Sequence, residues 1–248
     1  MLAVSNPDDD SIETIRSALT RALTSGEDPR QVLGTVCRAF ARIVPADGMS
    51  VAMSTRPDNR QLVFASDSVS EHVELLQHTL GVGPCVDAVV ERAPVLVPDI
   101  GDASGRWPAL VAELSALPVS AMFSLPLRAG AAVFGSLELY RRTPGMLESD
   151  QITAALRIGD VIAVALLALA TADGGSEVDP LRLAGRGDGA RSSDALHQAT
   201  GMLMAHYRIP AGSALARLRG YAYANGRLAH DVARDLTTRR LRVEDIDL

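Results

Sequence analysis

The sequence contains no lysine, since all 24 of its basic residues are arginines. Schiff-base catalysis and a Walker-type phosphate loop both need a lysine amine, so the usual forms of both are excluded. The absence of lysine, together with abundant alanine, glycine, valine and aspartate, is typical of a GC-rich genome. It also has a physical effect, because a planar guanidinium binds phosphates and stacks on bases better than an ammonium group does.

Cysteine is also scarce, with only Cys37 and Cys85 in 248 residues. Two thiols make no disulfide framework, and no pair of cysteines or histidines has zinc-finger spacing. The segment 1–10 lacks the basic region of a secretory signal. The longest apolar stretch, 161–170, is far shorter than the roughly twenty residues of a membrane span. We therefore expect a cytoplasmic protein without a metal site and without membrane contact.

Signs of catalysis are few. The five histidines are scattered along the chain, and His72 and His78 lie on one polar predicted helix, where we expect them to be solvated. No nucleophile elbow is present, although a Ser–His–Asp triad stays open until the fold is known. The sequence favours a protein that is not an enzyme.

The net charge of −6 is unevenly distributed. Before Arg191 there are 15 arginines against 24 acidic residues, whereas from Arg191 onward there are 9 arginines against 6 acidic residues. Three of those six acids fall in the last five residues, so the segment 191–242 is clearly basic. A basic module joined to an acidic one indicates that only the C-terminal part meets a polyanion.

Hydrophobic runs separated by turn residues predict a sheet in the first two thirds of the chain. An irregular lead to about residue 10 is followed by helical patterns at 12–23 and 32–43. The strand candidates are 49–53, 62–65, 95–97, 121–127 and 133–140, and the helix candidates between them are 73–80, 85–90 and 107–117. Four of the strands form two hairpin pairs rather than strand–helix–strand repeats. This arrangement predicts an α+β fold, with an antiparallel sheet and flanking helices.

A long helix is predicted at 150–171, and it is apolar on more than one side. One face can cover the sheet while another meets a partner chain. The segment 172–191 is rich in glycine, aspartate, serine and arginine, and we interpret it as a linker.

Three amphipathic helices are predicted after the linker. One helical face is formed by the residues at offsets 0, 3, 4, 7, 8 and 11 from Leu196, which are Leu196, Ala199, Thr200, Leu203, Met204 and Tyr207. Pro210 opens a second helix that ends at Asn225-Gly226, and a third follows through Leu228, Val232 and Leu236. Small residues on these helices allow close packing.

The same segment resembles the ANTAR domain, an RNA-binding output module of bacterial transcription antiterminators. The resemblance rests on residues 198–204 (Gln-Ala-Thr-Gly-Met-Leu-Met), 214–222 and 231–233. It implies that the family's target, a tandem stem-loop in a leader transcript, is held by a homodimer. The residues that it places on RNA, together with nearby arginines and tyrosines, are Gln198, Thr200, Gly201, Met204, Tyr207, Arg208, Arg217, Arg219, Tyr221 and Arg227. The basic surface would extend to Arg234, Arg239, Arg240 and Arg242.

The preceding part resembles a GAF domain, a fold similar to PAS domains whose antiparallel sheet often cups a small molecule. The motifs are Gly83-Pro84-Cys85-x-Asp87-Ala88, residues 94–100, Trp107-Pro108, and the strand end 135–140. The resemblance gives four segments: a lead and helix at 1–30, a GAF sensor at 31–171, a linker at 172–191 and an ANTAR domain at 192–248. No cofactor is expected beyond an unidentified small molecule in the GAF domain.

Candidate pocket residues in the GAF-like part are Phe64, Cys85, Asp99, Trp107, Phe123 and Glu138. A concave, mostly apolar site with a few polar groups suits a ligand. The phenylalanines could equally fill this space as core. Cys85 follows Pro84 near a predicted helix start, where a reactive thiolate would be favoured. A small core residue is the simpler interpretation of Cys85.

Together the two resemblances imply a signal-responsive transcription antitermination regulator. A signal in the GAF domain would change how two ANTAR bundles are presented to nascent RNA. Two alternatives stay open. A three-helix bundle can also carry a DNA-recognition helix, and a basic face can contact an acidic protein instead of a nucleic acid.

Overall fold

The computed structural model describes residues 17, 34–36, 40, 43–56, 59–171 and 188–246. Side chains are placed for these residues except 54–56, 59, 168–171 and 188–194. The helices predicted at 12–23 and 32–43 therefore lie largely outside the described residues, as does Cys37.

Five antiparallel strands form one sheet, in the order β2-β1-β5-β4-β3. The strands are β1 (Gly48–Arg56), β2 (Asn59–Ala65), β3 (Val95–Val97), β4 (Ala121–Ala129) and β5 (Ala132–Arg141). Both predicted hairpins are confirmed, since β1 pairs with β2 and β4 with β5. The central pairing of β1 with β5 places Ser50 opposite Glu138, and on the other side of β5 Ser124 is also opposite Glu138.

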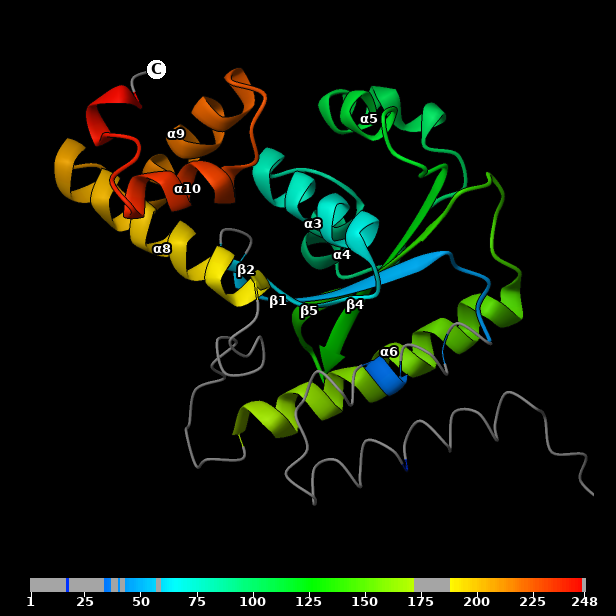
Figure 1. The fold of residues 1–248 in the computed structure, drawn as a ribbon. Helices are drawn as coiled ribbons and strands as arrows, with labels where there is room; N and C mark the ends of the chain where they lie inside the picture. The colour runs from blue at the N-terminus through cyan, green and yellow to red at the C-terminus, as the bar shows by residue number, and fades with distance from the viewer. Residues whose placement is uncertain are drawn as a thin grey trace, which may run out of the picture.

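Helices cover both faces of this sheet (Figure 1). On one face lies α6 (Ser149–Thr171), which confirms the predicted long helix. Its Ala155, Ile158 and Ile162 join a core with Phe123 and Leu139 from the sheet. On the other face lie α3 (Ser68–Leu80), α4 (Pro84–Glu91) and α5 (Pro108–Leu114), with the short 3-10 helix η1 (Gly101–Gly105) ahead of α5. A second core on this face includes Trp107 and Tyr140.

The ends of α3 follow from the sequence. The Asp67 carboxylate accepts a hydrogen bond from the Ser70 amide at 2.8 Å, which caps the first turn. Gly81 ends the helix in the left-handed conformation, with φ of 70°, and its amide donates to the Gln77 carbonyl. This helix separates the sheet from the C-terminal part of the chain.

The C-terminal bundle, residues 188–246, contains α8 (Asp188–Tyr207), α9 (Ala211–Ala224), α10 (Ala229–Thr237) and the 3-10 helix η2 (Val243–Asp245). Its core is small and aliphatic, as predicted, and includes Leu203, Leu218, Val232 and Leu236. The first helix is longer than its apolar pattern indicated, because it begins at Asp188, within the stretch predicted as a linker.

The C-terminal bundle packs against the sheet domain, residues 43–171, rather than standing apart from it. Figure 1 shows α9 and α10 beside α3, with α8 running past the edge strand β2. The Ala229 amide donates a hydrogen bond to the Thr79 hydroxyl at 3.0 Å, and Leu228 packs against the second core of the sheet domain. We call this contact surface between α3 and the C-terminal bundle the seam. No pattern in the sequence predicts this contact.

Candidate nucleic-acid interface and sensor core

Four of the predicted RNA-contact residues are exposed on α8 and at its C-terminal end. Gln198, Gly201 and Met204 follow one another at spacings of three residues, which keeps them on one side of the helix, and Arg208 follows directly after the last helical residue, in the left-handed conformation with φ of 54°. All four are exposed, and Met204 presents 38% of its surface to solvent although it is apolar. The strip therefore combines an amide, a thioether and a guanidinium on an open helical surface.

Gly201 lies within this strip, and the packing does not explain why it is glycine. A β-carbon added there would meet no heavy atom within 4 Å. Glycine inside a helix costs about 1 kcal/mol relative to alanine. By contrast, a β-carbon at Gly135 in β5 would lie 2.3 Å from the Ala52 carbonyl oxygen, so that glycine is required by the sheet. Gly201 therefore lowers the stability of α8, and no close packing inside the bundle requires a glycine there.

Three other predicted contact residues are engaged inside the C-terminal bundle. Thr200 is buried, and its hydroxyl donates to the Leu196 carbonyl at 2.7 Å. The Tyr207 hydroxyl lies 3.0 Å from the Val243 carbonyl oxygen and 3.2 Å from that of Ile246. The Arg217 guanidinium stacks over the Tyr207 ring at 4.2 Å and donates to the Ile246 carbonyl. Tyr207 and Arg217 therefore fasten the C-terminal segment to α8 and α9.

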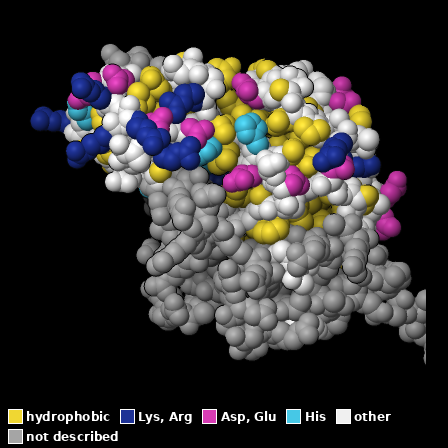
Figure 2. Space-filling view, viewed as in Figure 1, with side chains coloured by type: hydrophobic (Ala, Val, Ile, Leu, Met, Phe, Trp, Pro, Cys, Tyr) yellow, Lys and Arg dark blue, Asp and Glu magenta, His cyan; other side chains and the backbone are white. Residues whose placement is uncertain are grey.

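Exposed arginines gather on α10 and directly after it. Arg234 and Arg240 are 59% and 76% exposed at their side chains, and Arg239 and Arg242 are exposed as well. Figure 2 shows arginine side chains clustered over the C-terminal bundle. Acidic neighbours reduce this charge in part, since Arg234 pairs with Asp231 and Arg227 with Asp235. Such exposed pairs are weak and can exchange partners.

Arg219 does not lie on the open surface but at the seam. It is half-buried, and a β-carbon added at Gly81 would lie 3.0 Å from its Nη1 atom. The guanidinium thus rests on the C-terminal end of α3. Tyr221, two residues further along α9, is half-buried and packs against the core of the bundle. Of the ten predicted contact residues, the structure brings four onto one open strip and distributes the other six.

The predicted pocket residues of the sheet domain do not converge on one cavity. Phe123 and Phe64 pack on the α6 face, whereas Cys85, Trp107 and Glu138 lie on the face covered by α3, α4 and α5. Side chains alternate between faces along a strand, so Phe123 and its neighbour Ser124 point in opposite directions. Asp99 lies apart from both groups, where its carboxylate accepts from the Gly101 amide at 2.8 Å.

A buried polar network lies between the sheet and α3. Glu138 accepts hydrogen bonds from the Ser124 hydroxyl at 2.6 Å and from the Gln77 amide at 2.7 Å. Gln77 also accepts from the Cys85 amide at 2.9 Å. Beside it, the Arg60 guanidinium pairs with both carboxylate oxygens of Glu74 and donates to Ser136. Every side chain in this network is buried.

Arg60, Glu74 and Gln77 were not predicted as functional residues. A signal for them exists in the sequence, because Ser70, Val73, Glu74 and Gln77 share one face of α3, and Val73 marks that face as buried. Polar residues on the apolar face of a helix need partners inside the protein.

Burial sets the protonation of this network. It raises the pKa of Glu138 to about 7, with Glu74 adding to the effect, while Ser124, Gln77 and Arg60 oppose it. Burial also raises the pKa of the Cys85 thiol well above its ordinary value, and Glu74 and Glu138 add to this against Arg60. Cys85 is therefore a protonated core thiol, and the structure does not favour a reactive thiolate at this position.

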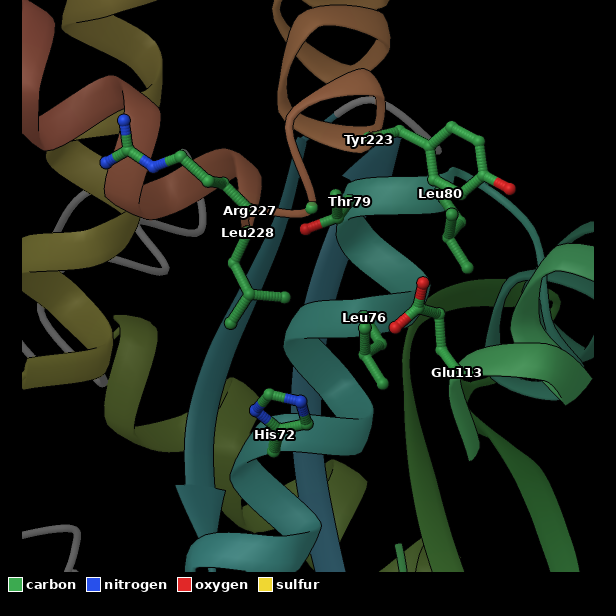
Figure 3. A pocket seen from close by; sticks show the side chains of 9 residues that line it. His72, Leu76, Thr79, Leu80, Glu113, Tyr223, Arg227 and Leu228 are labelled. Carbon is green, nitrogen blue, oxygen red and sulfur yellow. The ribbon is translucent and has the colours of Figure 1, made fainter. Parts of the chain in front are cut away.

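A pocket of about 110 Å³ opens at the seam (Figure 3). Its walls come from α3, α5 and the turn between α9 and α10. They consist of His72, Leu76, Thr79, Leu80, Glu113, Tyr223, Gly226, Arg227 and Leu228. Figure 3 shows the guanidinium of Arg227 directed away from the other lining side chains. The pocket is a gap at the domain contact, distinct from the buried network.

Neither a metal cluster nor a membrane helix occurs in the described part of the chain. No group of three or more histidine, cysteine, aspartate or glutamate side chains is placed there to hold a metal ion. The described helices are also too short or too polar to cross a membrane.

Comparison with known proteins identifies both parts of the chain. A model of the GAF domain matches residues 26–167, which is more than half of the chain, and a model of the ANTAR domain matches residues 189–236. No curated protein matches the sequence. The ANTAR match begins one residue after the start of α8 and ends within α10.

Solved structures similar to the chain include two GAF domains and an enzyme. The GAF domain of a phosphoenolpyruvate-protein phosphotransferase from Coxiella burnetii has 15% identity and a TM-score of 0.50, over 68% of this chain and 99% of that one. The corresponding domain from Acinetobacter has 12% identity and a TM-score of 0.48, over 65% and 94%. Free methionine-R-sulfoxide reductase from Neisseria meningitidis has 11% identity and a TM-score of 0.48, over 68% and 95%. At such identities the Coxiella likeness concerns the fold alone. With its five-stranded sheet, its covering helices and the two matching models, the chain belongs to the GAF domain family and carries an ANTAR domain behind its GAF domain.

Proposed function

We propose that this protein is a signal-responsive regulator that binds stem-loop RNA through its ANTAR domain and thereby controls transcription antitermination. The observation that carries the proposal is the exposed strip of Gln198, Gly201 and Met204 on α8, with Arg208 directly after the helix, within the matched ANTAR domain. The GAF domain supplies the sensor.

The chemistry of the strip suits an unpaired base. RNA-binding proteins read looped-out bases by stacking and by hydrogen bonds to the base edges. Gln198 offers an amide donor and acceptor, Arg208 offers a flat cation, and Met204 offers an apolar, polarizable surface. Gly201 leaves the helix backbone open between them, which allows a base or a sugar to approach closely. Close approach of the RNA would explain why this exposed position is a glycine, which the packing of the bundle does not require.

The exposed arginines on and after α10 would contact the phosphates. Arg234, Arg239, Arg240 and Arg242 surround the end of the bundle, and a folded RNA offers charge of the opposite sign. If four phosphates are neutralised, the logarithm of the affinity should fall with the logarithm of salt with a slope of about −3 to −4. Binding should therefore weaken strongly between low and moderate salt.

A homodimer would present two ANTAR domains to the two loops of a tandem stem-loop. The outer face of α6 offers a surface for such pairing, since Val164 and Leu156 are 61% and 37% exposed. Binding both loops would stabilise the antiterminator fold of the transcript at the expense of a terminator. This step is a population shift between two RNA structures, set by the difference in the protein's affinity for them.

A fluorescence anisotropy titration tests the proposal. The probe is an RNA with two small-looped hairpins, and the competitors are a random RNA duplex and a DNA duplex. Wild type should prefer the hairpin RNA, and Gln198→Ala and Arg208→Ala should each lower its affinity by about tenfold, the value of one lost polar contact. Arg142→Ala, at a position after β5 whose side chain is 59% exposed, is the matched control and should bind like wild type.

Equal binding of wild type and both strip variants to all three nucleic acids would overturn the proposal. A clear preference for duplex DNA would instead assign the bundle to DNA recognition. An absence of binding to any nucleic acid, in a folded protein, would favour a protein partner.

A further inference from the structure

Four of the five histidines in the chain lie at or beside the seam. His72 and His78 come from α3, His197 from α8 and His230 from α10. His72 lines the seam pocket, below Leu76 in the view of Figure 3. Only His206, which is exposed on α8 and stacks edge-on against Tyr207, belongs to the bundle alone. His78 was expected to be solvated, but its Nε2 atom is buried at the seam.

His78 is surrounded by groups that repel a proton. The charged and titratable groups that act on it are Arg219 from α9, Arg60 from β2, His197 from α8 and His230 from α10. Its Nε2 atom has no hydrogen-bond partner among the described residues. Burial first, and then the charge of Arg219 and of Arg60, with His197 and His230 adding to the effect, lower the pKa of His78 to about 3. In the docked arrangement His78 is therefore neutral.

His230 is in a similar position on the other side of the seam. Its Nδ1 atom is buried and has no hydrogen-bond partner among the described residues. Its Nε2 atom lies 3.3 Å from an oxygen of Asp231, which favours a proton. Burial nevertheless lowers the pKa of His230, and Arg234 and His72 add to that effect. His72 lines the seam pocket together with Glu113.

We propose that the seam is an acid-labile dock, in which protonation of His78 and His230 releases the C-terminal bundle from α3 and uncovers Arg219. At neutral pH the dock is held by the Thr79–Ala229 hydrogen bond and by Leu228 against the sheet domain. Acidification places one further cation beside Arg219, at His78, and a second at His230, which also acts on His78. The release of the bundle stands by itself, whereas its consequence for RNA rests on the proposed function.

The direction of the pH effect follows from the proton count. The docked state binds fewer protons than the released state, so docking has its full strength above the ordinary histidine pKa of about 6.5 and weakens as pH falls below it. Each histidine that must lose its proton lowers the docking constant by about tenfold per pH unit in that range. With both histidines involved, the loss approaches about a hundredfold per unit.

Fluorescence energy transfer in the full-length chain tests this inference. Dyes are attached through genetically encoded amino acids at Ala131, in the turn between β4 and β5, and at Ala205 on α8, both exposed. The labelled chain is diluted into excess unlabelled protein, so that only transfer within one chain is seen. The transfer efficiency should change between about pH 7 and about pH 5. Far-UV circular dichroism of the same samples separates release from acid unfolding.

The variants make the test specific. The double variant with His78→Gln and His230→Gln keeps neutral side chains at the seam, so its transition should move at least one pH unit lower. Each single variant should move it by a smaller amount, which keeps the test decisive if the double variant does not fold. His206→Gln, at the one histidine away from the seam, should behave like wild type.

Two results would overturn the inference. One is a wild-type efficiency that stays constant until the chain unfolds in acid. The other is a transition at the same pH in wild type and in the folded histidine variants. Because no RNA is present, neither result depends on whether the bundle binds RNA.

Discussion

Thr79 and Ala229 join the two domains of this protein through one buried hydrogen bond of 3.0 Å, from the backbone amide of Ala229 to the hydroxyl of Thr79. The same hydroxyl donates to the Leu75 carbonyl one turn earlier in α3, at 2.7 Å. The Thr79 side chain thus links the first turn of α10 to the middle of α3. Without it the amide at the start of α10 would be buried without an acceptor.

Thr79→Val should weaken the dock at every pH. The change keeps the shape of the side chain but leaves the Ala229 amide unsatisfied, at a cost of about 1–3 kcal/mol. Energy transfer between the domains should show a larger released fraction, and RNA affinity should rise as Arg219 is uncovered. Thr153→Val is the matched control, since the Thr153 hydroxyl also bonds to a carbonyl one turn earlier but has no contact with the bundle. Equal docking in both variants would contradict this role of Thr79.

Gly201→Ala should separate stability from binding. The added methyl group meets no heavy atom within 4 Å, so the helix should gain up to about 1 kcal/mol from the change. Affinity for the hairpin RNA should fall nonetheless, because the methyl group occupies the open space on the strip. Thermal unfolding and anisotropy titration measure the two effects. Gly212→Ala on α9, another glycine in open space, is the control that should leave RNA affinity unchanged. If Gly201→Ala binds RNA as wild type does, close approach at this position is wrong.

Glu138→Gln should flatten the pH dependence of stability in the GAF domain. Because the folded-state pKa of Glu138 is raised from 4.5 to about 7, the folded state holds its proton more tightly than the unfolded state does. Wild-type stability should therefore decline as pH rises through that window, by up to about 3 kcal/mol, and an amide removes this contribution. Urea unfolding near the two ends of the window measures it. Glu148→Gln, at an exposed position before α6, should keep the wild-type slope.

Tyr207→Phe should loosen the C-terminal segment without changing how RNA is read. The variant keeps the ring under Arg217 but removes the hydroxyl that bonds to the Val243 and Ile246 carbonyls. A loss of about 1 kcal/mol in the unfolding free energy of the bundle is expected, together with faster proteolysis after η2. Tyr223→Phe, whose residue is 54% exposed, is the control and should change neither quantity. If Tyr207→Phe lost RNA affinity at unchanged stability, the Tyr207 hydroxyl would contact RNA instead, and its role in fastening the C-terminal segment would be wrong.

The strands were predictable because their signals are local. Turn residues at 56–60 and 128–132 separate runs of strand-forming residues, and both hairpins form where these signals stand. The faces of the sheet were harder to predict. Phe123 and Glu138 are on opposite faces, and this follows from the pairing of Ser124 with Glu138, a register that no local pattern specifies. The predicted pocket therefore mixed residues from two separate cores.

The seam was beyond local reasoning for a different reason. Thr79 and Ala229 are 150 residues apart, and the hydrogen bond joins a side chain to a backbone amide, which leaves no trace in the sequence. His78 appeared solvated because it lies on a polar helix. On the RNA side, exposure was predictable for Gln198 and Gly201, which lie outside the apolar stripe predicted for this helix. Met204 was predicted within that stripe, but the structure exposes 38% of its surface. The partners of Tyr207 and Arg217 lie in a tail segment with no pattern of its own.

The thirteen residues of α3 serve two neighbours at once. One stripe, with Val73, Glu74 and Gln77, faces the sheet, and another, with Leu76 and Thr79, faces the bundle. A substitution that suits the sheet must also suit the bundle, so this short helix tolerates fewer changes than a helix with one face open to solvent. Evolutionary drift in related sequences should therefore accumulate at the chain termini and in the loops well before it reaches α3.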